Sequence, residues 1–197
     1  METGFLSNKL FSSTSVNGFC EYSLVAVPDI RTSVQVMEEK KYFSEKYQEG
    51  GVQTTQSGII IANFLAKEEM EATIIRWMHR IISNQKCFSV TLNRYGGCKS
   101  HTLYLRVQNH LPFQQLAKEL LVVDQYVRAN GCPEMHLNTR PYLPIVEKLS
   151  GEVYQEAIET YAQKLFHASF DVKELILIRK QYPFTVCKEV NVFRLQP

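Results

Sequence analysis

The chain lacks several features that mark particular protein classes. Its 197 residues contain no apolar run of the ~18 residues that a membrane-spanning helix needs. Charge of one sign is also scarce, because 22 Lys and Arg stand against 20 Asp and Glu. A net charge of +2 excludes a broad basic face for nucleic acids but allows a local anion site. We therefore expect a protein without a membrane span and without an extended basic track.

Paired cysteines are missing as well. None of the five Cys forms a CxxC pair, and an odd number without pairing is typical of free thiols in a reducing cytoplasm. Cys132 and His136 are four residues apart but have no second ligand pair, so we expect no metal and no cofactor. Met1 to Cys20 has no continuous apolar segment, which argues against a secretory signal. These absences predict a cytoplasmic protein.

The common nucleotide-binding and hydrolase motifs are absent. The chain has no Walker loop, no GxGxxG, no GxSxG and no HExxH. Any chemistry must therefore come from residues that the fold brings together.

Beyond the first 20 residues, apolar periodicity predicts regular elements throughout. Residues 1–20 are rich in Ser, Asn, Thr and Gly and are expected to be a poorly ordered lead-in to a single domain of two lobes over residues 21–197. Strands are predicted over residues 22–27, 58–64, 87–94, 101–108, 142–146, 170–179 and 187–195. Helices are predicted over residues 30–48, 68–83, 113–130 and 151–165, with Asp29 and Ser150 as N-caps.

Two local predictions can be checked directly. Gly96 and Gly97 separate two strands, which favours a hairpin turn at that point. Ile30, Val34 and Met37 recur at helical spacing, which predicts the first helix.

The order of elements suggests an internal duplication. Each half of the chain contains a strand, a helix and two further strands, although the residues themselves do not repeat. This order favours an α+β fold with two related antiparallel sheets and helices on their outer faces. One continuous sheet remains an alternative.

Among the five histidines, His101 and His136 are the strongest candidates for a site. His101 begins the strand HTLYLRV, where it is either a buried, hydrogen-bonded residue or one that faces a cleft. His136 lies in a loop beside Arg140, whose guanidinium is a good anion ligand. The other three histidines have positions that fit structural or surface roles.

Three segments carry a resemblance to a known family. GIIIANFLAKEEME, HTLYLRVQNHLPFQQLAKEL and NTRPYLPIVEKL resemble the two-histidine (2H) phosphoesterases, in particular the 2′-5′ RNA ligase-like proteins. The resemblance implies two lobes with a cleft between them and, in each lobe, a strand with the motif His-x-Thr/Ser. It also implies a metal-independent reaction on 2′,3′-cyclic phosphates or 2′-5′ linkages, in which one His is the general base and the other the general acid.

The resemblance fails at the residues that carry this chemistry. Its first motif places Gly58 at the His position and Ile60 at the Thr position, and its second places Tyr142 and Pro144 there. Gly, Ile and Pro have no side chain that transfers a proton, and the Tyr hydroxyl, with a pKa near 10, is a poor base at neutral pH. The sequence therefore predicts that the acid–base pair of the family is lost.

Three hypotheses follow from this pattern. The first is a non-catalytic protein that binds a nucleotide, or an RNA with a terminal or cyclic phosphate, in the cleft through the candidate residues Asn63, His101, His136, Arg140 and Tyr142. The second is a divergent active phosphodiesterase that uses His101 and His136, although these are only 35 residues apart (136 − 101). The third is a structural or protein-interaction module.

Overall fold

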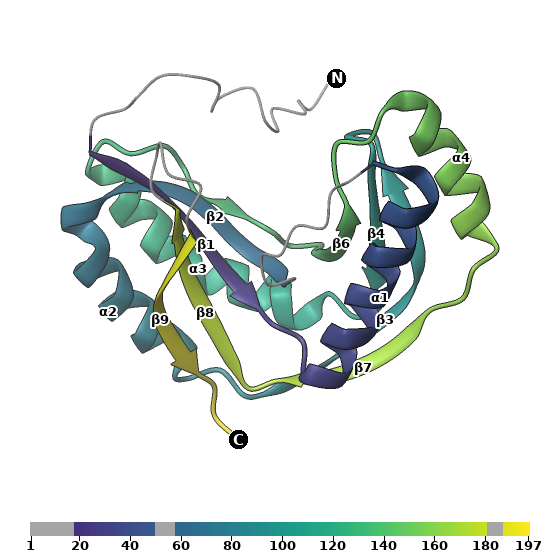
Figure 1. Ribbon diagram of the computed structural model, residues 1–197. Helices are drawn as coiled ribbons and strands as arrows, with labels where there is room; N and C mark the ends of the chain where they lie inside the picture. Colours follow the sequence, from purple (N-terminus) through teal and green to yellow (C-terminus); the bar gives the residue numbers. More distant parts are fainter. Residues whose placement is uncertain (1–17, 50–57, 181–186) are drawn as a thin grey trace, which may run out of the picture.

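The computed structural model describes residues 18–49, 58–180 and 187–197. These residues form two antiparallel sheets that lie close together at the bottom of Figure 1 and diverge toward its top. The expected lead-in over residues 1–20 lies outside the described residues up to Asn17. Phe19 and Cys20, however, already belong to the first strand, because Cys20 is an apolar-face residue of that strand and is buried. The regular structure therefore begins earlier than the composition suggests.

One sheet has five strands in the order β5-β2-β1-β8-β9. The strands are β1 (Phe19–Ala26), β2 (Ile59–Lys67), β5 (His136–Leu137), β8 (Glu174–Lys180) and β9 (Cys187–Arg194). A short 3₁₀ helix, η1 (Glu68–Met70), leads into α2 (Glu71–Ile82), which packs with α3 (Leu111–Ala129) against one face of this sheet (Figure 1). The opposite face carries no helix of the described residues.

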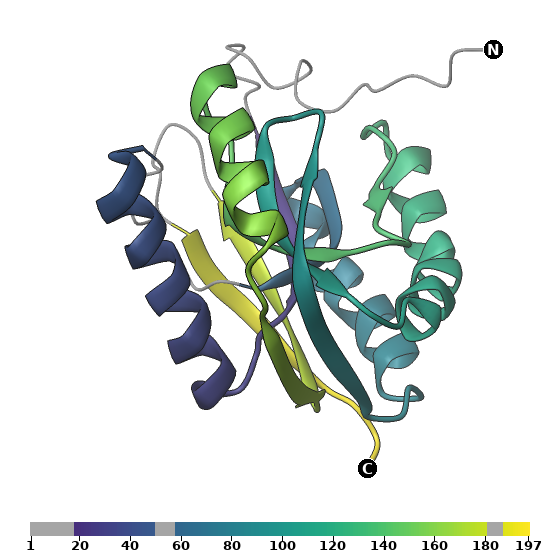
Figure 2. The ribbon, with the colours of Figure 1, turned by 90° about the vertical axis from the view of Figure 1, so that its right-hand side faces the viewer.

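The other sheet has four strands in the order β6-β4-β3-β7. Its strands are β6 (Tyr142–Val146), β4 (Thr102–Val107), β3 (Phe88–Cys98) and β7 (His167–Val172). Two helices, α1 (Ile30–Tyr47) and α4 (Gly151–Ala162), cover its outer face. Figure 2 shows the two pairs of helices on opposite sides of the molecule. The expected α+β class with two antiparallel sheets and outer helices is confirmed, and no helix in the described ranges is long and apolar enough to cross a membrane.

The two sheets do not correspond to the two halves of the chain. β1 and β2 share a sheet with β8 and β9, whereas β3 and β4 share the other sheet with β6 and β7. The single strand predicted over residues 170–179 is wrong for the same reason, because β7 lies in one sheet and β8 in the other. The buried positions reveal the break, since Val172 and Leu175 are three residues apart and interrupt the period of two. The chain passes between the sheets at Lys173.

The hairpin between β3 and β4 turns later than predicted. Gly96 and Gly97 lie inside β3, and the turn is made by residues 99–101, where His101 has a positive φ of 53°. The glycines are required for close packing instead. A Cβ at Gly97 would lie 2.3 Å from Cδ1 of Ile158 and 2.5 Å from the hydroxyl of Tyr154, both on α4. Gly97 thus allows α4 to approach the sheet.

This contact predicts a destabilising substitution. Gly97→Ala should lower the free energy of unfolding by about 1–3 kcal/mol, because the new methyl group overlaps Ile158. Urea denaturation of the single variant and of Gly97→Ala combined with Ile158→Val measures the effect. The second change removes the overlapping Cδ1, so the double variant should regain part of the loss. Equal stability of Gly97→Ala and the unmodified chain would contradict this packing.

The first helix forms as predicted, but the apolar residues whose spacing predicts it are not the ones it buries. The exposed fractions of Ile30, Val34 and Met37 are 86%, 52% and 39%, whereas Val36 and Phe43 are fully buried. Asp29 caps the helix as expected by accepting a hydrogen bond from the backbone N–H of Thr32 (2.8 Å). Two apolar stripes therefore run along this helix, and the local pattern alone could not indicate which one faces the sheet.

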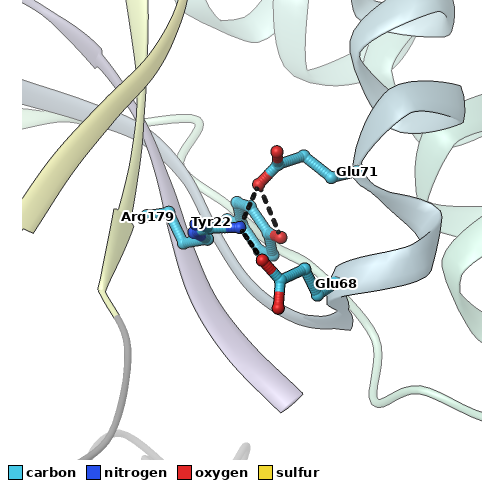
Figure 3. A network of polar contacts seen from close by, with 4 residues as sticks. All are labelled: Tyr22, Glu68, Glu71 and Arg179. Carbon is cyan, nitrogen blue, oxygen red and sulfur yellow. Dashed lines mark hydrogen bonds and ion pairs between the residues drawn. The ribbon is translucent and has the colours of Figure 1, made fainter. Parts of the chain in front are cut away.

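A charged cluster fastens α2 to the five-stranded sheet. The guanidinium of Arg179 on β8 lies 2.7 Å from Glu68 and 3.0 Å from Glu71, and the hydroxyl of Tyr22 on β1 donates to Glu71 (3.0 Å) (Figure 3). The Arg179 side chain is only 12% exposed, so its charge requires these two carboxylates. The cluster lies on the helix-covered face and joins two strands to the start of α2.

Candidate functional site

A cavity of about 170 Å³ lies where β2 of one sheet meets β6 of the other. Its lining combines apolar, aromatic, amide, hydroxyl and charged side chains. These are Ile60, Asn63, Ser100, Thr102, His136, Asn138, Tyr142, Pro144, Glu147 and Lys148. The two strands that resemble the family's motif strands therefore contribute to the same cavity.

On β2, Ile60 and Asn63 face the cavity. Ile59 and Ile61 are fully buried. The pairing with β1 shifts register between Leu24 and Val25, so that Ile60 and Asn63 share a face although they are three residues apart. The hydroxyl of Ser23 donates to Oδ1 of Asn63 (2.7 Å), which holds the carboxamide and leaves its NH₂ group as a donor.

On β6, the period of two places Tyr142 and Pro144 toward the cavity and buries Leu143 and Ile145 on the other face. The ring of Tyr142 lies 4.5 Å from that of Tyr104 on β4, with an angle of 32° between them. Burial raises the pKa of the Tyr142 hydroxyl above its usual value, and nearby Cys98 adds to the shift. Because this shift moves the pKa further from neutrality, the Tyr142 hydroxyl is even less available as a general base at neutral pH than the residue type implies.

The segment around β5 closes one side of the cavity. His136 pairs with Asn63 across the edge of β2. Asn138 fixes the segment, because its backbone N–H donates to the carbonyl of Ile61 (2.8 Å) and its side chain donates to that of Ile60 (3.2 Å). Asn138 also accepts a hydrogen bond from the backbone N–H of Arg140 (3.3 Å). The amide side chain thus serves the loop as well as the cavity wall.

Sequence reasoning missed the remaining polar lining. Ser100 and Thr102 lie at the β3–β4 turn, with their hydroxyls 3.1 Å apart, and Glu147 and Lys148 follow β6. Lys40 of α1 interacts electrostatically with Glu147, although burial lowers the pKa of Lys40. No motif marks these residues. Only the pairing of β4 with β6 brings the turn beside the end of the motif strand.

The structure brings some of the sequence candidates together and separates others. Ile60, Asn63, His136, Tyr142 and Pro144 line the cavity, whereas Gly58, His101 and Arg140 are not part of the lining.

Gly58 lies against the end of β1. A Cβ at this position would be 3.2 Å from the carbonyl oxygen of Ala26 and 3.3 Å from Cβ of Val25. His101 is held elsewhere, because its ring stacks on Tyr154 at 4.9 Å and its Nδ1 is 3.1 Å from the carbonyl oxygen of Leu149. His101 and His136 therefore do not share one cavity wall.

The chemistry available in the cavity follows from this lining. His136 supplies an imidazole, and no second histidine belongs to the lining drawn from the described residues. A phosphodiester reaction that uses two imidazoles on opposite sides of the substrate therefore finds one of them in this lining, and the carboxylate of Glu147 is a further group there that can transfer a proton. Among residues 18–49, 58–180 and 187–197, no group of three or more His, Cys, Asp or Glu could hold a metal ion. Amide, hydroxyl and ammonium groups remain as hydrogen-bond donors.

An α+β chain of two antiparallel sheets, with outer helices and a polar cavity between β2 and the edge strand β6, has the fold of LigT. The model of the 2′-5′ RNA ligase superfamily matches residues 60–182, and the chain belongs to that family. No curated protein sequence matches the chain.

Solved structures share the fold at low sequence identity. Escherichia coli LigT complexed with 3′-AMP has a TM-score of 0.65 and 16% identity, and the match covers 91% of this chain and 99% of LigT. The protein TT0787 of Thermus thermophilus has a TM-score of 0.63 and 14% identity, covering 89% of this chain and 98% of that one. Another E. coli LigT structure contains ATP (TM-score 0.61, 15% identity, coverage 91% and 99%). These matches define the architecture along almost the whole chain.

Proposed function

We propose that this chain is a non-catalytic member of the 2′-5′ RNA ligase superfamily, and that its cavity binds a nucleotide through the phosphate and the base. The observation that carries the proposal is the composition of the cavity. Ile60 and Pro144 stand at positions where the family resemblance implies hydroxyl side chains, yet donors from Asn63, His136 and Lys148 surround them. The cavity thus has polar groups that can bind a ligand, while its lining lacks the histidine pair that the family resemblance implies. We place this activity in the cytoplasm, in keeping with the free cysteines.

A nucleotide fits the chemistry of the lining. Lys148 supplies a positive charge for a phosphate, the amides of Asn63 and Asn138 supply directional hydrogen bonds, and the Tyr142 ring offers a surface for a base. Lys40 partly offsets the negative charge of Glu147, which would otherwise oppose an anion. LigT structures with 3′-AMP, ATP and NADP⁺ make a nucleotide the natural first ligand to test.

Binding without turnover is the expected result. Calorimetric titration of the purified chain should detect 3′-AMP and ATP, while 2′,3′-cyclic AMP should be bound but not hydrolysed. Lys148→Gln should weaken 3′-AMP binding about 10-fold, because a charged hydrogen bond is lost, and should leave adenosine binding unchanged. Lys41→Gln is the matched control, because this lysine lies on α1 and is 73% exposed.

Two results would overturn the proposal. Hydrolysis of 2′,3′-cyclic AMP that His136→Ala abolishes would favour a divergent phosphodiesterase. Absence of binding by a folded chain to 3′-AMP, ATP and inorganic phosphate would favour the interaction module, for which the exposed stripe of Ile30, Val34 and Met37 is the natural surface.

A further inference from the structure

The face of the four-stranded sheet that no helix covers adjoins the cavity and extends from it as a flat surface. Tyr142 of β6 lies in register with Arg106 of β4, and its ring contacts that of Tyr104, so all three side chains share one face. This is the cavity face, since Tyr142 lines the cavity. Gly97 and the helix α4 mark the opposite face. We call the surface formed by Tyr142, Tyr104 and Arg106 the aromatic floor.

Gly96 makes the aromatic floor flat. A Cβ at this position would lie 2.8 Å from the ring of Tyr104 and 2.9 Å from Nε of Arg106. Both side chains therefore lie down across β3 and do not stand upright. Two strand spacings separate β6 from β3, so the floor extends roughly 10 Å from the cavity. That span is larger than one phosphate group.

Arg106 has the features of a ligand-binding cation. It is exposed, and no hydrogen bond or ion pair joins it to any residue in the part of the chain that the structure describes. An arginine that is held flat beside an aromatic ring and has no carboxylate partner can donate hydrogen bonds to a phosphate. Tyr104 and Tyr142 are half-buried, so their rings are held in place and retain surface for a ligand.

Polar groups continue beyond the floor on the same face. The hydroxyls of Thr91 and Ser169 lie 3.0 Å apart across β3 and β7, and the Ser89 hydroxyl donates to Asp171 (2.6 Å). In β7 the residues alternate strictly between exposed and buried, so this face is open to solvent across the sheet. The surface beyond the cavity is therefore hydrated and accessible.

We infer that the aromatic floor is a second subsite, which binds the next nucleotide of a single-stranded oligonucleotide whose terminal nucleotide occupies the cavity. Base stacking on Tyr104 and a phosphate contact with Arg106 provide the interaction, and neither depends on base identity. A short floor with a single arginine fits a ligand of two or three nucleotides, in agreement with the net charge of +2. The inference rests on the proposed function, because the cavity must hold the terminal nucleotide.

The test compares a mononucleotide with a short RNA. Fluorescence or calorimetric titration should show that a triadenylate with a 3′-phosphate binds the unmodified chain about 10-fold or more tightly than 3′-AMP. Tyr104→Leu and Arg106→Gln should each remove most of this gain, about 10-fold, and change 3′-AMP binding less than about 2-fold. Tyr104→Phe keeps the ring and should bind as the unmodified chain does. Arg80→Gln, at an exposed position on α2, is the charge-matched control.

The outcomes separate the two proposals. If 3′-AMP binds but triadenylate binds no more tightly, or if Arg106→Gln and Tyr104→Leu have no effect on triadenylate, the second subsite is wrong and the cavity proposal stands. If neither ligand binds, both proposals are wrong. A lower slope of log affinity against log salt in Arg106→Gln than in Arg80→Gln would support the phosphate contact, since one counterion fewer is released.

Discussion

Replacing Gly58 and Tyr142 by His, and Ile60 and Pro144 by Thr, is expected to create phosphodiesterase activity in a chain that we propose to be non-catalytic. The changes place two imidazoles with pKa values near neutrality, one just before β2 and one at the start of β6. Positioned general acids and bases contribute about 10²–10⁴-fold to such reactions. We expect the lower end of this range for hydrolysis of 2′,3′-cyclic AMP, because a Cβ at Gly58 meets the carbonyl of Ala26 at 3.2 Å and Cβ of Val25 at 3.3 Å.

Half-restored variants provide the control for this gain. Gly58→His with Ile60→Thr, or Tyr142→His with Pro144→Thr, should stay at background, because each supplies only one half of the acid–base pair. The full variant should show a rate that rises and then falls with pH, with its maximum near the pKa of histidine. A four-residue variant that melts cooperatively yet hydrolyses nothing would show that the two motif strands do not face each other in the productive geometry.

Alkaline pH is expected to unfold the protein steeply. Burial raises the pKa of Tyr22, Tyr95 and Tyr161, whose side chains are almost inaccessible, above the value near 10 of an exposed tyrosine. Because the folded pKa values exceed the unfolded ones, stability is complete below pH 10 and decreases as the pH rises above it. Each tyrosine contributes up to ~1.4 kcal/mol per pH unit, so the three together approach ~4 kcal/mol. A domain with ~5–15 kcal/mol of stability loses much of it within two units.

A single hydroxyl group tests this prediction. The buried hydroxyl of Tyr161 has no hydrogen-bond partner among the described residues, so Tyr161→Phe should raise the free energy of unfolding at pH 7 by about 1 kcal/mol. The same change should reduce the slope of stability against pH above pH 10 by about one third. Urea unfolding between pH 8 and pH 12 measures both effects, and Tyr42→Phe, which is 46% exposed, is the control. An unchanged slope in Tyr161→Phe would show that other groups govern alkaline unfolding.

Much of the fold could be predicted because local patterns and global packing agree. The alternation in β6, the caps Asp29 and Ser150, and the end of α3 before Gly131 all follow from local rules that the structure obeys. The predictions fail where two local solutions are equally good. On α1 either apolar stripe could face the sheet, and at Gly96 and Gly97 either a turn or close packing explains glycine.

The candidate site was predictable only where it lies on strands. The period of two places Ile60, Tyr142 and Pro144 on definite faces, and all three line the cavity. The strand β5 has two residues, which is too short for a period of two to be recognised in the sequence. The hydrogen bond by which Asn138 anchors this segment to β2 could therefore not be predicted. Gly58 and His101 fall outside the lining because backbone contacts at the ends of their strands, which no period describes, decide their positions.

The sequence by itself determined the α+β class, most of the elements and the family resemblance, and it predicts that all four motif residues are replaced. Those properties are local, because each depends on residue type and spacing along a few turns or one strand. Only the tertiary structure decided that the halves of the chain interleave between the sheets and that Ser100, Thr102, Glu147 and Lys148 join the cavity. The tertiary structure likewise decided the aromatic floor, because the register of β4 against β3 and β6 brings its residues together. Strand register couples residues far apart in sequence, and no pattern within one segment encodes it.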